Sequence, residues 1–334
     1  MADHPGRGVR ARERRRRGGR DMSAPPVRVG LIGLGTMGSI MARALLAQGH
    51  EVWGHDPVAR LRQRWARAGV RTPGSNGEVA RHAQVLILSL PSADALRSVV
   101  QECALVAPAQ RGQIVMETST LPLADKLWAA RELRRQGRVM LDAPISGTAT
   151  PSPETTWIMY LSGPVAACRQ AARLARAFTL SAPRVGPLGS GIKLKIAANH
   201  LVAVYNVACA EMVALCQAMG LDPQVALQHM GSSPYIGTGL MRLRMPMMIQ
   251  REYLPATMKI ELWQKDMQVI GDMARAARCP TPLLNACSAV YTAAMAQGLN
   301  EHDTAAVSEV LAASTRAGLP GAGQGRRAAR SHTP

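Results

Sequence analysis

Aromatic side chains are scarce in this chain: they make up 3% of its 334 residues, and Phe178 is the only phenylalanine. Proteins that bind single-stranded nucleic acid stack bases on aromatic side chains. No basic segment here is interleaved with aromatics, so the sequence gives no sign of such a binder. The hydrophobic content of 47% is that of a globular protein, and its core must be built from aliphatic residues and the 18 methionines.

Acidic residues are also few, 22 against 40 lysines and arginines, which gives a formal net charge of +18. Much of the excess lies at the ends: residues 1–25 hold eight arginines against three acids, and residues 316–334 hold four arginines and no acid. Charged, glycine-rich segments with few apolar residues are typical of disordered tails. We therefore expect disordered tails at 1–25 and 316–334 and no nucleic-acid partner. The remaining positive charge would suit an anionic cofactor and a carboxylate substrate.

The six cysteines form no CxxC pair and no metal-ligand spacing. We expect free thiols in a reducing, cytoplasmic compartment and no metal site. The most apolar stretch, 196–219, includes Asn199, His200 and Glu211, so it predicts a buried core helix and no membrane span. The N-terminus lacks the apolar region of a secretory signal. Met22 directly precedes the first expected strand, so a basic tail and a start at Met22 both stay open.

Short apolar runs alternate with amphipathic stretches up to about Leu188. Strands are expected at 27–32, 51–55, 85–90, 113–117, 139–143 and 156–161, and helices at 38–48, 58–68, 123–136 and 164–178. This alternation predicts a Rossmann-like α/β domain with a doubly wound parallel sheet over residues 26–188. Strand signals disappear after Gly191. A long helix over 192–219 then predicts an all-α domain over residues 189–315 for substrate binding and oligomerisation.

A glycine fingerprint follows the first expected strand and opens the first helix. It reads Gly33, Leu34, Gly35, Thr36, Met37, Gly38, a G-x-G-x-x-G. In this context the first glycine permits a tight turn, the second lets the backbone approach a pyrophosphate, and the third lets helix and strand pack closely. The helix N-terminus then offers free N–H groups to the anion. The motif predicts a dinucleotide site.

Asp56 ends the second expected strand, 23 residues after Gly33. A carboxylate there can bind the adenosine ribose hydroxyls and would repel a 2′-phosphate, so it favours NAD over NADP. A structural interpretation is compatible with this one: Asp56 could cap the next helix, with Pro57 at its first position.

Several motifs in order resemble the β-hydroxyacid dehydrogenases, the family of 3-hydroxyisobutyrate dehydrogenase. They are the stretch Val29–Gly38, Leu90-Pro91, Ser119-Thr120, Asp142–Gly147, Gly189-Ser-Gly191 leading to Lys195 and Asn199, and Lys265-Asp266. The resemblance covers about residues 27–313. It implies an NAD-binding α/β domain followed by a helical domain, and a homodimer or homotetramer.

The resemblance also implies a role for individual residues. The cofactor would be contacted by Leu90, Pro91 and Thr120, with Lys265 near the nicotinamide. The substrate carboxylate would be bound by Ser146 and Gly147, with Asn199 beside the substrate. Lys195 would be the catalytic residue.

Physical reasoning supports the central pair independently of the family. Lys195 and Asn199 are four residues apart, so they share one face of a helix that is otherwise apolar. Buried polar groups must be paired or functional. To exchange a proton with a hydroxyl, Lys195 needs a pKa lowered by burial and a nearby cation, for which Lys265 is the candidate. The alternative is a solvated helix lysine, as expected for Lys193.

The chain departs from the family pattern at several positions. The acid before Ser119-Thr120 is Glu117 where the family has Asp, and Thr148 stands where the family has a second glycine. Ala95 replaces an asparagine that contacts the cofactor. Ala198 stands at the histidine position of the phosphogluconate dehydrogenases, which counts against that activity.

The sequence therefore predicts an NAD-dependent dehydrogenase of a small, 3-hydroxyisobutyrate-like acid, with NADP the less favoured cofactor. An alternative is an NADPH-dependent reductase of a small semialdehyde or keto acid. A third, non-enzymatic alternative is a nucleotide-binding protein whose basic tail associates with nucleic acid. The sequence leaves the substrate and the direction of reaction open.

Overall fold

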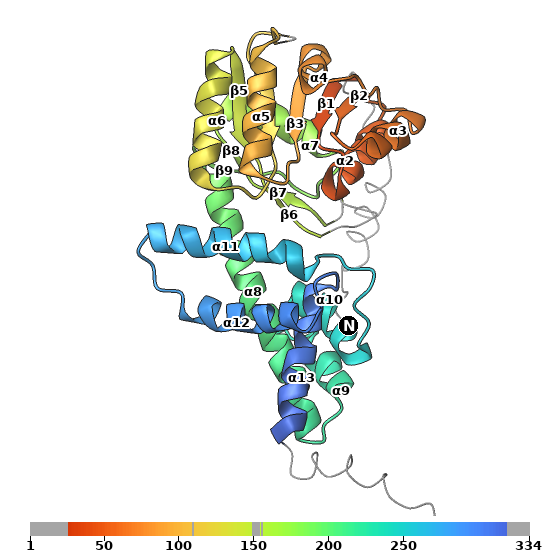
Figure 1. Ribbon diagram of the computed structural model, residues 1–334, viewed down its shortest axis with the longest axis vertical. Coiled ribbons are helices and arrows are strands. Elements are labelled where there is room, and N and C mark those ends of the chain that lie inside the picture. Colours follow the sequence, from red (N-terminus) through yellow and green to blue (C-terminus); the bar gives the residue numbers. More distant parts are fainter. Residues whose placement is uncertain (1–25, 109, 149–153, 155, 319–334) are drawn as a thin grey trace, which may run out of the picture.

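The computed structural model describes residues 26–108, 110–148, 154 and 156–318. A sheet with helices on both faces forms the upper part of the molecule in Figure 1, and helices gathered around α8 (Ser190–Ala218) form the lower part. The tail expected at 1–25 lies outside the described residues. The tail expected at 316–334 also lies outside the described residues, apart from residues 316–318, which belong to α13 (Val307–Gly318).

The main sheet has seven strands in the order β2-β1-β3-β4-β5-β8-β9. Their bounds are β1 Arg28–Ile32, β2 Glu51–His55, β3 Val85–Leu88, β4 Gln113–Glu117, β5 Arg138–Asp142, β8 Leu161–Ser162 and β9 Arg184–Gly186. The first five strands in this order are parallel. The order reverses at β1, and such switch points are where open α/β sheets bind ligands, at the carboxyl ends of their strands.

The predicted doubly wound parallel sheet is confirmed as a mostly parallel one, and the edge beyond β5 contains its antiparallel pairing. β8 pairs antiparallel with β5, and β9 pairs parallel with β8. The single strand expected at 156–161 is two strands, because β7 (Ile158–Met159) pairs with β6 (Ile145–Ser146) in a separate small sheet. Tyr160 lies between β7 and β8 and donates its N–H to the Pro144 carbonyl at 2.9 Å. That contact redirects the chain from one sheet to the other.

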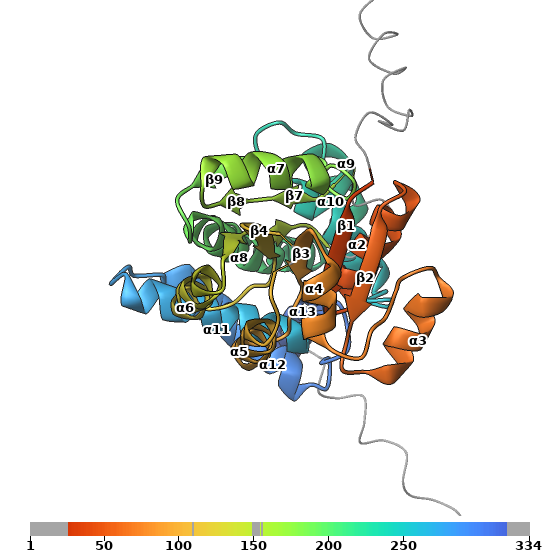
Figure 2. The same cartoon turned by 90° about the horizontal axis from the view of Figure 1, so that it is seen from above.

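Helices cover both faces of the main sheet, as the doubly wound prediction requires (Figure 2). One face carries α2 (Thr36–Ala47), α3 (Ala59–Arg67) and α7 (Val165–Ala175), and the other carries α4 (Asn76–His82), α5 (Ala93–Ala104) and α6 (Leu123–Arg135). Consecutive strand residues point to opposite faces. Accordingly Leu31 and Ile87 belong to one buried cluster, whereas Ile32 and Leu86 belong to the other.

The helical part is built on α8, with α9 (Pro223–Met230), α10 (Gly239–Gln250), α11 (Ile260–Ala276), α12 (Pro282–Ala296) and α13 around it. Within the described residues, α8 is the one helix whose length and composition would allow it to cross a membrane, and 39% of its most apolar window is buried. It packs against α10, α11, α12 and α13 and buries Lys195, Asn199 and Asn206. This is the position of the core helix that the sequence predicts.

Candidate functional site

The glycine fingerprint has the geometry that its sequence predicts. Gly33 has φ of +94°, and a Cβ there would lie 2.1 Å from the Ser89 carbonyl oxygen. A Cβ on Gly38 would lie 1.9 Å from the Gly33 carbonyl oxygen. Nothing lies within 4 Å of the corresponding position on Gly35. The first and third glycines are therefore required by close backbone packing, and the second faces open space.

The start of α2 fits a pyrophosphate in that space. Thr36 and Met37 form its first turn, no side chain caps it, and that turn has no acidic residue. The free N–H groups and the positive end of the helix dipole are an anion site. The described residues thus fit a dinucleotide, whose phosphates the open space at Gly35 and the start of α2 would hold.

Asp56 is buried at the end of β2 and both of its carboxylate oxygens accept backbone hydrogen bonds. Leu34 N–H donates to Oδ2 and Val58 N–H donates to Oδ1, each at 2.9 Å. Asp56 therefore fixes the glycine loop against β2. The expectation that Asp56 caps the next helix, with Pro57 at its first position, is wrong: Val58 is the N-cap of α3, no side chain caps that helix, and Pro57 lies before it. Each carboxylate oxygen can accept a second bond, so the ribose role stays a prediction.

The segments after β3 and β4 lie together at the same edge of the sheet. Ser119 Oγ accepts a hydrogen bond from Leu90 N–H at 2.8 Å, which joins the two segments predicted to line the cofactor, and Thr120 follows directly. Lys265 reaches this edge from α11, with Nζ 3.4 Å from the Pro91 carbonyl oxygen. The fold therefore brings Lys265 to the predicted cofactor loop.

The predicted substrate loop follows β6 and rests on a buried tryptophan. Gly147 has φ of +156°, and a Cβ there would lie 2.3 Å from Trp157 Cδ1. Trp157 is fully buried, and its Nε1 donates to the Thr148 carbonyl oxygen at 2.7 Å. Ser146 lies in β6, which contacts α8. Trp157 is a member of the site that the sequence does not reveal, because nothing in its local pattern links it to a loop nine residues earlier.

Lys195 and Asn199 are both buried on the same face of α8, as their spacing predicts. Lys195 is 9% exposed and Asn199 is 3% exposed. Lys193 is exposed, as expected for a solvated neighbour. Asn199 Nδ2 donates to Asp266 Oδ2 of α11 at 3.0 Å. Burial lowers the pKa of Lys195, and the Asp266 carboxylate acts against that shift. A buried amine with a lowered pKa is suited to proton transfer near neutral pH.

The charged group that acts on Lys195 is the Asp266 carboxylate, an anion. The hypothesis was that a cation, Lys265, lowers the pKa of Lys195. Lys265 is exposed and acts on its neighbour instead. Burial raises the pKa of Asp266, while Lys265 and Lys195 oppose that rise. Asp266 is thus a member of the site to which the sequence analysis gave no role. The signal was available, because Asp266 is adjacent to Lys265 in the quoted motif.

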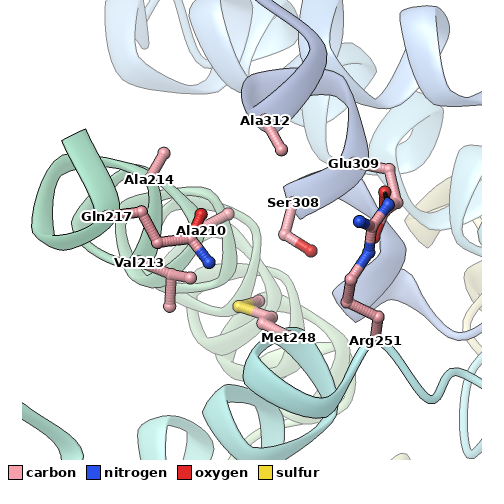
Figure 3. A pocket seen from close by; sticks show the side chains of 9 residues that line it. All are labelled: Ala210, Val213, Ala214, Gln217, Met248, Arg251, Ser308, Glu309 and Ala312. Carbon is pink, nitrogen blue, oxygen red and sulfur yellow. Dashed lines mark hydrogen bonds and ion pairs between the residues drawn. The ribbon is translucent and has the colours of Figure 1, made fainter. Parts of the chain in front are cut away.

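Other features of the described residues do not compete with this site. They contain no group of three or more His, Cys, Asp or Glu side chains that could hold a metal. All six cysteines are free, and five of them are buried. A pocket between α8, α10 and α13 holds the Arg251–Glu309 ion pair and none of the predicted site residues (Figure 3).

The chain is similar to known proteins over most of its length. Residues 28–182 match the family described as the NAD binding domain of 6-phosphogluconate dehydrogenase, and residues 189–311 match the NAD-binding family of NADP-dependent 3-hydroxyisobutyrate dehydrogenase. L-threonate dehydrogenase of Cupriavidus necator is 30% identical over 85% of this chain and 95% of its own length. 3-Sulfolactaldehyde reductase of Escherichia coli is 29% identical over 84% of this chain and 94% of its own length.

A solved structure shows the same fold over nearly the whole of its chain. The 3-hydroxyisobutyrate dehydrogenase of Mycobacterium tuberculosis with L-serine superimposes with a TM-score of 0.78 at 23% identity, and covers 86% of this chain and 99% of its own. Together with the sequence relatives, the two matched families show an NAD(P)-dependent oxidoreductase. The chain therefore belongs to the β-hydroxyacid dehydrogenase family.

Proposed function

We propose that this enzyme oxidises a small, 3-hydroxyisobutyrate-like β-hydroxy acid with NAD and that Lys195 is its acid–base residue. One observation carries the proposal: a lysine with a lowered pKa is buried on α8, beside Asn199 and Asp266. Asp266 belongs to α11, and Lys265 of the same helix contacts the predicted cofactor loop at the Pro91 carbonyl oxygen. Neighbouring residues of α11, Lys265 and Asp266, thus contact the predicted cofactor loop and act on Lys195, respectively.

The chemistry needs one proton and one hydride to leave the same carbinol group. A nicotinamide cofactor, which the glycine loop, Leu90-Pro91 and Thr120 would hold, would supply the hydride acceptor in oxidation and the hydride donor in reduction. Neutral Lys195 takes the hydroxyl proton onto Nζ in oxidation. In reduction its ammonium donates that proton to the carbonyl oxygen. Ser146 and Gly147 would hold the substrate carboxylate, and Asn199 would fix the hydroxyl-bearing carbon near Lys195.

Asp56 supports NAD as the preferred cofactor. Its carboxylate is held at the end of β2 by Leu34 N–H and Val58 N–H, so it cannot turn away from a 2′-phosphate without breaking both bonds. One observation favours the alternative, an NADPH-dependent reductase of a small semialdehyde. Arg62 Nη1 lies 2.6 Å from the Asp56 carbonyl oxygen and 3.0 Å from that of Pro57, so a guanidinium is present at this turn.

A substrate panel tests the proposal. The full chain is assayed with small β-hydroxy acids plus NAD or NADP, and with the matching semialdehydes plus NADH or NADPH. We expect turnover of at least one hydroxy acid with NAD at a higher kcat/KM than with NADP. Reduction of a semialdehyde with NADPH at a higher kcat/KM than any oxidation would favour the alternative. No turnover in either direction would contradict both.

Assembly and location are further proposals with more limited support. Apolar side chains of α8 are exposed on one chain: Leu201 is 49% and Leu215 58% exposed. Such a surface fits a homodimer or homotetramer, which light scattering on the purified chain would test. The buried free thiols fit the cytoplasm. The nucleic-acid alternative rests on segments outside the described residues, and the salt dependence of DNA binding by full and tail-deleted chains tests it.

A further inference from the structure

Three charged side chains form a fully buried cluster where β4 and β5 end. Lys126 Nζ of α6 lies 2.6 Å from Glu117 Oε2 and 2.7 Å from Asp142 Oδ1, and all three side chains are 0% exposed. Glu117 and Asp142 are paired residues of neighbouring strands. Burying charges is unfavourable unless every polar atom has a partner. The other partners of these carboxylates therefore indicate what the cluster holds in place.

Asp142 extends the cluster to the start of α8. Its Oδ2 accepts a hydrogen bond from Ile192 N–H at 2.8 Å. Ser162 Oγ lies 3.1 Å from the same oxygen and accepts from Gly191 N–H at 3.0 Å. Helix α8 itself has no capping side chain and no acidic residue in its first turn. The sheet thus supplies, from residues far away in sequence, the cap that the helix lacks.

This cap lies one turn before the proposed acid–base residue, because Ile192 and Lys195 are three residues apart on α8. The first turn also touches the sheet directly: a Cβ on Gly191 would lie 2.5 Å from the Tyr160 carbonyl oxygen and 2.9 Å from that of Asp142. The cluster holds one ammonium and two carboxylates. Its excess negative charge faces the positive end of the α8 dipole, which is the favourable arrangement.

Lys126 keeps its charge in this setting. Burial alone would lower the pKa of Lys126, but the charges of Glu117 and Asp142 outweigh burial and raise it. The ammonium therefore engages Asp142 Oδ1 and leaves Oδ2 for α8.

We propose that Asp142 and Ser162 are positioning residues for Lys195, which they set by capping the first turn of α8 from the sheet, with Lys126 as the counter-ion that orients Asp142. The inference rests on the proposed role of Lys195. It adds that the direction of the catalytic amine is fixed by the α/β part of the fold through two hydrogen bonds. A displacement of about 1 Å at a reacting group can lower turnover on the order of 100-fold.

The chain offers a matched control for the test. Asp142→Asn and Glu117→Gln each remove one carboxylate from the same cluster and leave Lys126 one partner. Only the first variant disturbs the contact with Ile192 N–H. Ser162→Ala removes the acceptor for Gly191 N–H without changing any charge, and it carries the test if Asp142→Asn does not fold.

Two measurements separate positioning from a merely structural role. The first is the pH dependence of kcat and of KM with the best substrate of the panel. The second needs no substrate: the acetylation rate of Lys195 against pH, with exposed Lys193 as the internal reference, read by mass spectrometry. We expect Asp142→Asn to lower kcat at least tenfold and to displace both profiles. Ser162→Ala should displace them in the same direction by less. Glu117→Gln should leave the Lys195 labelling profile close to that of the native chain, and that profile is the control, because Glu117 also accepts a hydrogen bond from Ser119 N–H at the predicted cofactor loop.

The outcomes distinguish this inference from the proposed function. Positioning would be refuted if Asp142→Asn and Glu117→Gln gave equal Lys195 labelling profiles. If Asp142→Asn does not fold, an unchanged Lys195 profile in Ser162→Ala would refute it. Either result would stand even if the native enzyme oxidises hydroxy acids. If the native chain turns over no hydroxy acid, the proposed function fails. A Lys195 labelling profile displaced by Asp142→Asn and not by Glu117→Gln would then still support positioning of that amine.

Discussion

Gly147→Ala tests the assignment of the substrate loop. The glycine has φ of +156°, and its new Cβ would lie 2.3 Å from Trp157 Cδ1. Trp157 cannot move aside easily, because it is fully buried and bonded to the Thr148 carbonyl oxygen. The loop that carries Ser146 must therefore shift. Backbone strain of this kind costs about 1–3 kcal/mol.

If that strain is released by moving the carboxylate-binding loop, kcat/KM for the substrate should fall roughly 5- to 150-fold, since about 1.4 kcal/mol is a factor of ten. The cofactor site lies on other loops, so the Kd for NADH, followed by fluorescence titration, should stay within about twofold. The control is Gly49→Ala. Gly49 also has a positive φ, of +83°, but nothing lies within 4 Å of its Cβ position.

The assay is steady-state kinetics at saturating cofactor, with the melting temperature of each variant measured in parallel. We expect both variants to lose some stability and only Gly147→Ala to lose substrate affinity. A weakened Kd for NADH in Gly147→Ala, or equal kinetic losses in both variants, would show that the 146–148 loop does not bind the substrate carboxylate.

Three further changes have expected outcomes. Asp266→Asn removes the charge that opposes the lowered pKa of Lys195, so the acid limb of the pH–kcat profile for oxidation should move to lower pH; movement to higher pH would contradict the pairing. Asp56→Asn should raise kcat/KM with NADP relative to NAD, and an unchanged ratio would remove Asp56 from the ribose site. Asp303→Ala leaves buried Arg244 without its ion pair and should cost about 3–5 kcal/mol of unfolding free energy, measured by urea denaturation. Arg244→Met should cost less, because Asp303 also accepts hydrogen bonds from five other groups.

The sequence predicts the α/β part well where apolar runs and glycines are strong signals. β2 and β4 have the expected bounds, and the fingerprint glycines lie where their packing roles require. Helices α4 and α5 were missed, although each begins with a serine that caps it: Ser75 accepts from Glu78 N–H and Ser92 accepts from Ala95 N–H. Helix α4 is too short for a clear hydrophobic period, so its cap is the better signal. Helix α5 does have a helical period, with Leu96, Val99, Val100 and Cys103 buried, and that signal was available in the sequence.

The site is predicted in part, for a reason that can be stated physically. Lys195 and Asn199 stand out because polar residues are unusual on an apolar helix, and that argument is local. The buried partners of charged groups are not local. Lys126 lies in an amphipathic helix pattern that is typical of a solvated lysine, and its burial depends on Glu117 and Asp142 from two strands. Contacts that depend on the packing of strands and helices distant in sequence leave no periodic signal in one chain.

Substitution of Lys195 tests the central claim most directly, with Lys193 as the neighbouring control. Lys195→Ala should lower kcat about 10²- to 10⁴-fold, the contribution of a positioned acid–base group. It should change the Kd for NADH little, because the predicted pyrophosphate and ribose contacts lie in the α/β part of the fold. Lys193 is exposed on another face of α8, so Lys193→Ala should keep kcat within about threefold. Retained turnover in Lys195→Ala, or equal losses in the two variants, would contradict the account.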